Sequence, residues 1–169
     1  MDKKEVRLRA MEPEDLDLLY KIENDEQLWN VSTTNVPYSR YVLRDYIANA
    51  KNDIFADGQV RLIIENQDNV SVGILDLVNF DSKHQRAELG IIILNEHRGK
   101  GYARSAVEKI IRHSREYLHL LQIYAYIDVH NTNSLKCLES IGFQKNAQLK
   151  DWFFENGQFH DAYVMQFFL

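Results

Sequence analysis

The residues best suited to chemistry are six consecutive ones that combine two glycines with two basic side chains: Arg98, Gly99, Lys100, Gly101, Tyr102 and Ala103. An apolar, strand-like run at 89–94 precedes them, and an amphipathic helix begins directly after them. The first amides of a helix lack intrahelical partners and carry the positive end of the helix dipole. Because glycine lets the backbone approach a phosphate closely, this pattern predicts an anion site. The alternative is an ordinary strand-to-helix turn.

Two nucleotide-binding motifs do not match this loop. A P-loop has Lys and then Ser or Thr after its second glycine, whereas Gly101 is followed by Tyr102. A dinucleotide-binding loop has a third glycine where this chain has Arg104. A phosphate-loop nucleotide binder stays open as an alternative, and it predicts binding of ATP or GTP.

The composition bounds the class of protein. With 169 residues, 45% of them hydrophobic, the chain is long enough to bury a core as one domain covering 1–169. A net charge of −5 without a basic cluster argues against a nucleic-acid partner. Apolar runs stay shorter than the ~18 residues of a membrane span, so no membrane partner is expected. The single cysteine, Cys137, fits a reducing compartment and favours the cytoplasm.

The periodicity of apolar residues predicts a mixed α/β order of elements, β-αα-βββ-α-β-α-ββ. Strands are expected at 6–8, 61–65, 71–80, 86–94 and 123–128, followed by two that begin near Phe143 and after Asn156-Gly157. One helix is expected to begin at Pro13 and a second to follow a Ser39 cap. Two more are expected over 101–117 and over 133–141, and the last of them ends at Gly142. The Asn-Gly pair predicts a two-residue hairpin turn.

Two segments resemble one known family. The loop at 98–103 matches the Q/R-x-x-G-x-G/A signature of the GNAT superfamily of acyl-CoA-dependent N-acyltransferases. The segment at 131–143 is similar to the family's N-x-x-[AS]…G-F helix, which lies beside the pantetheine arm of coenzyme A. The resemblance implies the GNAT fold, an α/β (α+β) fold whose mixed, mostly antiparallel sheet has about seven strands flanked by about four helices. It also implies acetyl-CoA as co-substrate.

Stretches 85–93 and 152–159 look like the spermidine N-acetyltransferase branch, and the ribosomal-protein N-acetyltransferase branch is also similar. By this resemblance, loop amides hold the coenzyme pyrophosphate, and main-chain groups at the end of the preceding strand pair with pantetheine. The amide of Asn131 meets pantetheine or the phosphates, with a plain turn residue as the alternative. The expected cofactor-binding residues are Ile91, Ile92, Ile93, Arg98, Gly99, Lys100, Gly101, Tyr102, Ala103 and Asn131.

Acetyl transfer to an amine also needs a base, because a primary amine with a pKa of ~10.4 arrives mostly protonated. Glu88 matches the catalytic glutamate of histone-type GNAT enzymes and is expected to act as this base and to contact the substrate. A structural ion pair with Arg86 is the alternative. Asp76, one strand earlier, matches an acidic position of the polyamine enzymes and is expected to bind an ammonium group.

The resemblance has one departure. Many members carry a tyrosine, proposed to protonate the departing thiolate, where this chain has Leu138. Ser134, one helical turn earlier, matches a serine of the ribosomal-protein branch and is a candidate to assist the thiol; a capping role is the alternative. The departure leaves open a coenzyme-A-binding module without turnover.

Acceptor choice is expected to depend on 24–38, with Trp29 contacting the substrate, and on the final hairpin. Because 31–35 contains no acidic residue, the acceptor stays open between a polyamine such as spermidine and the α-amino group of a peptide. The histidines are scattered without a ligand motif, so no metal site is expected. The oligomeric state is open, a homo-oligomer included.

Overall fold

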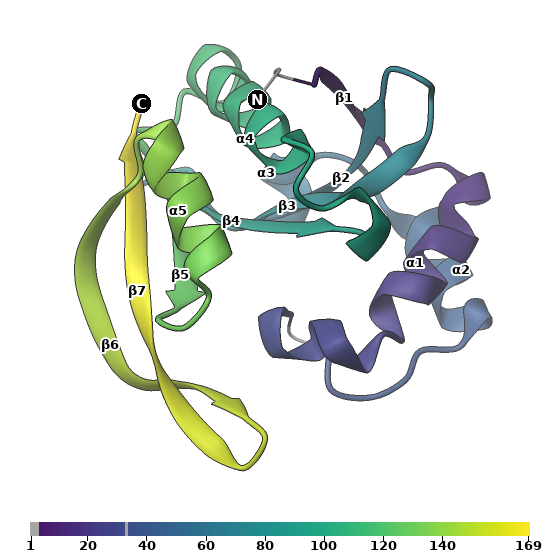
Figure 1. Ribbon diagram of the computed structural model, residues 1–169. Helices are drawn as coiled ribbons and strands as arrows, with labels where there is room; N and C mark the ends of the chain where they lie inside the picture. Colours follow the sequence, from purple (N-terminus) through teal and green to yellow (C-terminus); the bar gives the residue numbers. More distant parts are fainter. Residues whose placement is uncertain (1–3, 33) are drawn as a thin grey trace.

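The computed structural model describes residues 4–32 and 34–169, which form one seven-stranded sheet (Figure 1). The strand order is β1-β2-β3-β4-β5-β7-β6, and the pairs are antiparallel except for the parallel pair β4–β5. The strands are β1 (Val6–Ala10), β2 (Val60–Asn66), β3 (Ser71–Asp81), β4 (Arg86–Ile93), β5 (Gln122–Asp128), β6 (Gln144–Glu155) and β7 (Gln158–Phe168). The mixed, mostly antiparallel sheet confirms the predicted fold class.

Five α-helices accompany the sheet in the described residues: α1 (Leu16–Glu23), α2 (Arg40–Asn49), α3 (Ile54–Asp57), α4 (Tyr102–Glu116) and α5 (Thr132–Ile141). The same described residues contain three 3-10 helices, η1 (Pro13–Asp15), η2 (Glu26–Val31) and η3 (Asn95–His97). The four predicted helices are present, and α3 is additional. It is a single turn, capped by Asp53 and ended by Gly58, and is too short to show a helical period.

Local caps explain where several elements begin and end. The Ser39 hydroxyl accepts a hydrogen bond from the Val42 amide at 3.1 Å at the start of α2. Helix α5 ends at Gly142, whose φ of +118° favours glycine. Asn156 and Gly157 have φ of +50° and +78°, as a primed hairpin turn requires.

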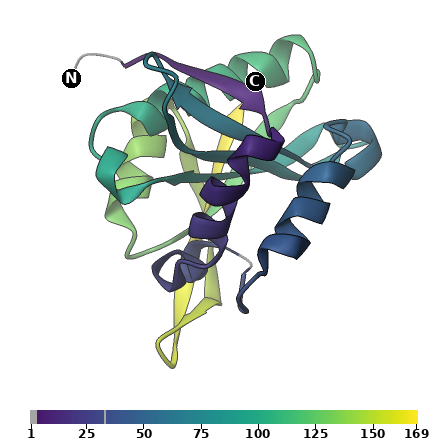
Figure 2. The ribbon, with the colours of Figure 1, turned by 90° about the vertical axis from the view of Figure 1, so that its right-hand side faces the viewer.

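Helices cover both faces of the sheet. On one face, α1 and α2 lie against the sheet (Figure 2). They bury an apolar cluster against β2 and β3, with Leu19, Leu43, Ile63 and Ile74 at its centre. On the other face, α4 and α5 cover a larger cluster, to which α4 contributes Ala106, Val107 and Ile110, and α5 contributes Leu135 and Leu138. No helix among the described residues is long and apolar enough to cross a membrane.

The sheet opens between its two parallel strands. Only the first residues of β4 pair with β5, and Glu88 opposite Tyr124 is the last such pair. Strand β4 nevertheless continues to Ile93, held on its other side by β3, while β5 continues beside β7. The edge of β4 that faces β5 is therefore without a strand partner from residue 89 onward, in front of the glycine loop.

Candidate active site

The glycine loop between η3 and α4 has the geometry of an anion site. Gly99 and Gly101 have φ of +72° and +84°, and no atom lies within 4 Å of where a side-chain Cβ would stand on either residue. Gly101 is the N-cap of α4, and no side chain caps the helix. The first amides of α4 are therefore left for an external acceptor, at the positive end of the helix dipole.

Basic side chains brace this loop on the end of β4. Arg98 Nε donates to the Ile93 carbonyl oxygen at 3.0 Å, and Lys100 Nζ donates to the Glu96 carbonyl oxygen at 2.8 Å. Both cations thus stay at the loop that the anion would approach. The loop residues and the free edge of β4, predicted from sequence as cofactor contacts, are adjacent in the structure.

Helix α5 packs against α4, the helix that follows the glycine loop. Burial raises the pKa of the Cys137 thiol on α5, and the charge of Arg104 on α4 acts in the opposite direction. At the start of α5, the Asn131 side-chain oxygen accepts the Ser134 amide at 3.2 Å. Asn131 therefore caps the helix and keeps its amide donors for other partners. Ser134 is half-buried in the first turn.

Glu88 lies where β4 and β5 separate. It faces Tyr124 across the last strand pair, and its Oε2 accepts a hydrogen bond from Asn79 Nδ2 at 2.7 Å. Burial, and then the Glu88 charge, raise the pKa of the Tyr124 hydroxyl. Arg86 forms its ion pair with Asp81, at 3.3 Å, in place of the alternative pair with Glu88.

Asp76 shares the sheet face of Glu88, because its register partner Gly90 lies two residues beyond Glu88. Both of its carboxylate oxygens accept hydrogen bonds from Arg61 at 2.8 Å. A third guanidinium nitrogen contacts Glu23 at 2.6 Å, and Glu23 also accepts from the Thr34 hydroxyl at 2.6 Å. Asp76 is therefore one member of a half-buried row of side chains across α1, β2 and β3.

The row formed by Thr34, Glu23, Arg61 and Asp76 was not anticipated from the sequence, apart from Asp76. Burial lowers the pKa of Arg61, but the hydrogen bonds and charge of Asp76, with smaller contributions from Tyr46 and Glu23, outweigh this and raise it above its usual range. The guanidinium thus stays charged between two carboxylates, and the row keeps one net negative charge. Only the cross-strand register, which places Arg61 opposite Asp76, reveals the pair.

Part of the segment expected to wall the amine side, η2, lies beside the final hairpin. In η2, Trp29 Nε1 donates to the Glu23 carbonyl oxygen at 2.9 Å, and η2 contacts β6 of the hairpin. From the hairpin, Trp152 packs against Tyr126 of β5, with ring centroids 5.3 Å apart. Part of this segment, residue 33, lies outside the described residues.

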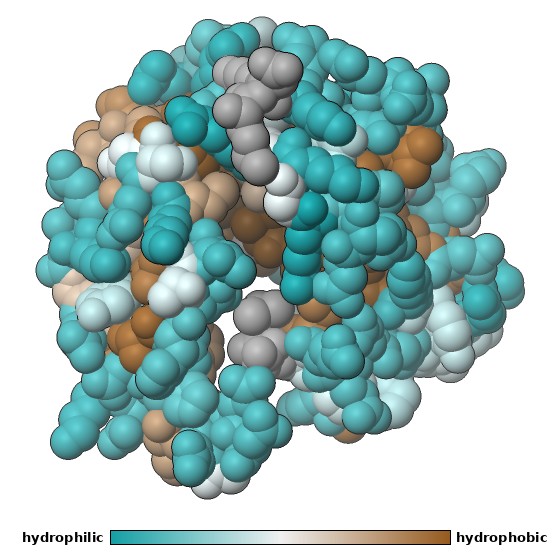
Figure 3. All heavy atoms as spheres, in the orientation of Figure 1, coloured by the Kyte–Doolittle hydropathy of each residue, from teal (hydrophilic) through white to brown (hydrophobic). Residues whose placement is uncertain are grey.

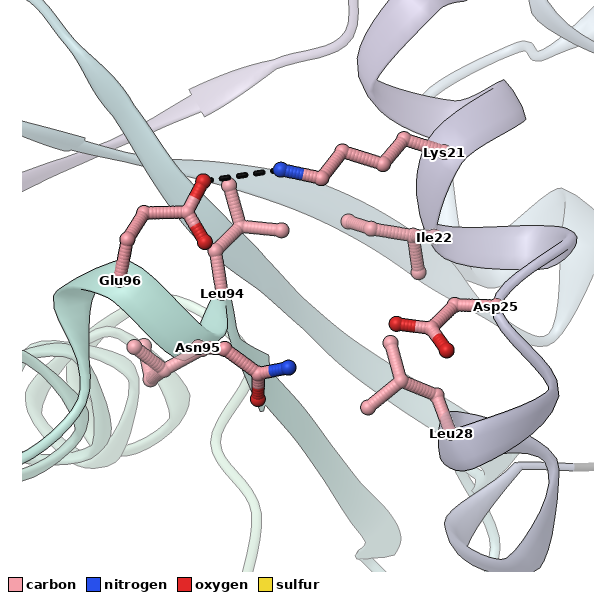
Figure 4. Close-up of a pocket in the computed structure, with 8 residues that line it drawn as sticks. Lys21, Ile22, Asp25, Leu28, Leu94, Asn95 and Glu96 are labelled. Atoms are coloured by element: carbon pink, nitrogen blue, oxygen red, sulfur yellow. Dashed lines mark hydrogen bonds and ion pairs between the residues drawn. The ribbon is translucent and has the colours of Figure 1, made fainter.

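A crevice separates α1 and η2 from the end of β4 (Figure 4). Its lining is apolar at Ile22, Leu28 and Leu94, and the Lys21–Glu96 ion pair, at 2.8 Å, bridges it. In the space-filling view, the surface is hollowed between the α5 and hairpin side and the α1 side (Figure 3).

Leu138 stands where a tyrosine acid would be expected, and the structure places it in the core. It is 4% exposed and belongs to the cluster beneath α4 and α5. Its side chain has no proton to donate.

A further group that the sequence spacing does not reveal is a cluster of Asp128, His130 and His160, brought together by β5, the turn after it and β7.

Comparison with known proteins agrees with this geometry. The Acetyltransferase (GNAT) domain family matches residues 5–144. The chain is 28% identical to the spermidine N(1)-acetyltransferase of Vibrio cholerae, over 96% of this chain and 94% of that protein. It is 29% identical to a putative ribosomal N-acetyltransferase of Bacillus subtilis, over 92% of this chain and 87% of that protein.

A solved structure shows the same fold over nearly the whole chain. It is the crystal structure of spermidine N-acetyltransferase from Vibrio cholerae in complex with CoA and spermine, with a TM-score of 0.85 at 27% identity, covering 97% of this chain and 95% of that one. Enzymes of this family use acetyl-CoA, and the open loop amides and unpaired β4 edge suit it. Because the family match spans most of the chain, the protein belongs to the GNAT acetyltransferase family and is an N-acetyltransferase.

Proposed function

We propose that the protein transfers an acetyl group from acetyl-CoA directly to a primary amine in a ternary complex, with a polyamine such as spermidine as the favoured acceptor. The observation that carries the proposal is the position of Glu88. Its carboxylate lies on the same face of the sheet as Asp76, a member of the row formed by Thr34, Glu23, Arg61 and Asp76, which is called the amine-side row from here on. At this point β4 separates from β5, and the β4 backbone beyond it has no strand partner on that edge. A base and a thioester site are thereby adjacent.

The cofactor side rests on backbone groups. Amides of residues 99–103 receive the pyrophosphate, with the charges of Arg98 and Lys100 held beside it. The free edge of β4 at residues 91–93 hydrogen-bonds pantetheine and directs an amide at the thioester carbonyl oxygen. One oriented backbone donor at a developing oxyanion contributes roughly 3 kcal/mol of transition-state stabilisation.

Glu88 takes the proton of the substrate ammonium, directly or through a water molecule. Asn79 engages one carboxylate oxygen and leaves the other for this transfer. The neutral amine attacks the thioester carbon, its second proton passes to solvent, and the C–S bond breaks. Because a thiol has a pKa of ~8.5, the thiolate is a tolerable leaving group without a tyrosine acid. Ser134 is the candidate to assist it.

The charge of the side chains on the amine side supports a cationic acceptor. The Glu23–Arg61–Asp76 row retains one negative charge on the amine side, which suits a cationic substrate, and similarity to spermidine enzymes supports the same choice. Trp29 borders this side. A peptide α-amino group is the second candidate, favoured by Ser134 and by the absence of acidic residues at 31–35.

A thiol-release assay with acetyl-CoA tests the proposal. Spermidine, free amino acids, aminoglycosides and peptides with free α-amino groups are compared by kcat/KM. We expect the polyamine to give the largest value. A preference for the peptides would identify a peptide α-amino group as the acceptor in place of a polyamine. Tight acetyl-CoA binding by calorimetry, without thiol release in the presence of any amine, would instead identify a non-catalytic binding module.

A further inference from the structure

We propose that Asp128, His130 and His160 form a binding site for one divalent zinc-class cation at the end of β5. The three residues are separated by up to 32 positions in the chain, yet each offers a ligand atom within 4.8 Å of the others. The inference concerns a second site and does not depend on which amine the enzyme acetylates.

The sheet register produces the cluster. Asp128 is the last residue of β5 and pairs with Ala162 of β7. His160 lies two residues before Ala162, and side chains two residues apart share a face of a strand, so its ring lies beside Asp128. His130 follows in the turn before α5, where its backbone amide donates to Asp128 Oδ1 at 2.8 Å. Three separate segments therefore converge on one carboxylate.

The distances suit a metal site that closes with small movements. His160 Nδ1 lies 2.8 Å from Asp128 Oδ2, His130 Nδ1 lies 3.1 Å from Oδ1, and the imidazole centroids are 5.0 Å apart. Ligand atoms around tetrahedral zinc, at bonds of about 2.0 Å, stand about 3.3 Å apart. The three ligand atoms lie within 4.8 Å of one another. Side-chain rotations that move these atoms by about 1.5 Å therefore suffice to bring them to the separations found around tetrahedral zinc.

The donor types and their exposure indicate which ion fits. Two imidazoles and one carboxylate favour zinc over magnesium or calcium, which prefer oxygen ligands. The Asp128 and His160 side chains are 19% and 21% exposed, so their geometry is held by the surrounding structure. His130 is 74% exposed and leaves an open side, where a water molecule can complete four-coordination.

A cation here would join the β5–α5 turn to the β6–β7 hairpin. His130 directly precedes Asn131, the cap of α5, and His160 belongs to the hairpin strand. Both segments border the opening of the sheet, where Trp152 of the hairpin packs on Tyr126. The expected consequence is a more stable hairpin in the metal-bound protein, since a ligand that binds only the folded state stabilises it.

Metal titration of the chelator-treated protein tests the site. Calorimetry with Zn²⁺ alone is expected to give one equivalent, and Co²⁺ is expected to show the visible absorption of a tetrahedral complex with nitrogen and oxygen ligands. His130→Ala should weaken Zn²⁺ binding by about 100-fold or more, because it removes a whole ligand and loss of second-shell support alone costs 10–100-fold. His84→Ala, in the exposed β3–β4 turn, is the matched control and should bind as the unaltered protein does.

Asp128→Asn and His160→Ala are supporting variants, with folding checked by circular dichroism because both residues are partly buried. Zn²⁺ should raise Tm in the unaltered protein and in His84→Ala but not in His130→Ala. The proposal is overturned if saturating Zn²⁺ does not bind, or if His130→Ala binds it as tightly as His84→Ala. In that case, the cluster is only a hydrogen-bonded Asp–His group.

Discussion

Glu88 and Tyr124 face each other across the last paired position of β4 and β5. One residue further on, the two strands diverge, so the carboxylate lies at the apex of the opening in the sheet. The same strand carries Glu88, the proposed base, at its paired end, a backbone edge without a strand partner in its middle and the glycine loop after its end. This sequence of features along β4 defines the candidate active site.

Replacing the base is the most direct test of the proposed chemistry. Glu88→Gln is expected to lower kcat/KM for the amine by about 100-fold to 10,000-fold at neutral pH. The deficit should shrink at alkaline pH, because more of the amine is then already neutral. Acetyl-CoA affinity, measured by calorimetry, should stay unchanged. Asp68→Asn, in the exposed β2–β3 turn, is the control. Full activity of Glu88→Gln across this pH range would remove Glu88 from the role of base.

The close approach of β3 and β4 beside the opening can be tested with two glycines. A Cβ at Gly73 would lie 2.1 Å from the Ile92 carbonyl oxygen, whereas one at Gly90 would meet only the Asp76 Cβ at 3.6 Å. Gly73→Ala is therefore expected to cost about 1–3 kcal/mol in the free energy of unfolding. It should also weaken acetyl-CoA binding by displacing the β4 backbone. Urea denaturation of Gly73→Ala and Gly90→Ala measures the difference, and equal stabilities would contradict it.

The amine-side row should be sensitive to loss of its cation. Arg61→Met leaves the carboxylates of Glu23 and Asp76 without their shared cation at side-chain exposures of 12% and 21%. Because the row is only half-buried, removal of the cation is expected to cost more than the ~1 kcal/mol of an exposed pair and less than the ~3–5 kcal/mol of a fully buried one. Arg40→Met removes the exposed pair with Asp17 and should cost under about 1 kcal/mol. If chemical denaturation gives similar losses for both variants, the row does not stabilise the fold.

Acid stability should depend on Glu65. Hydrogen bonds from Arg9 outweigh the burial of this residue and, with those from Arg7, hold the pKa of its carboxyl below the ordinary 4.5. The unfolded chain therefore takes up the proton first as the pH falls. The contribution of Glu65 is complete above the ordinary glutamate range and is lost as the pH drops through the folded-state pKa.

Urea midpoints measured between about pH 2 and pH 6 test this linkage. Glu65→Gln should be less stable than the unaltered protein at the upper end of this range, and the two should converge toward the lower end. Parallel curves would mean that the Arg9–Glu65 contact does not shift the titration. Glu14→Gln, an exposed residue of η1, is the control and should follow the unaltered protein throughout.

The predictable part of the fold is the part encoded in short segments. Ser39 caps α2, and Asn156-Gly157 turns the final hairpin, because each of these features involves residues within a few positions of each other. The glycine loop could be recognised for the same reason. The single turn of α3 could not, since four residues do not complete a hydrophobic period. The capping alternative for Ser134 was wrong, because Asn131 is the cap of α5 and Ser134 only donates its backbone amide to it.

The sequence by itself determined the family, the cofactor loop and the order of elements, because these follow from local patterns along the chain. Tertiary structure decided which distant side chains meet. Strand register brought Arg61 to Asp76, and His160 of β7 to Asp128, and it ended the β4–β5 pairing at Glu88. A shift of one residue in any of these pairs would turn the side chains to opposite faces, and nothing in the separate segments specifies that alignment.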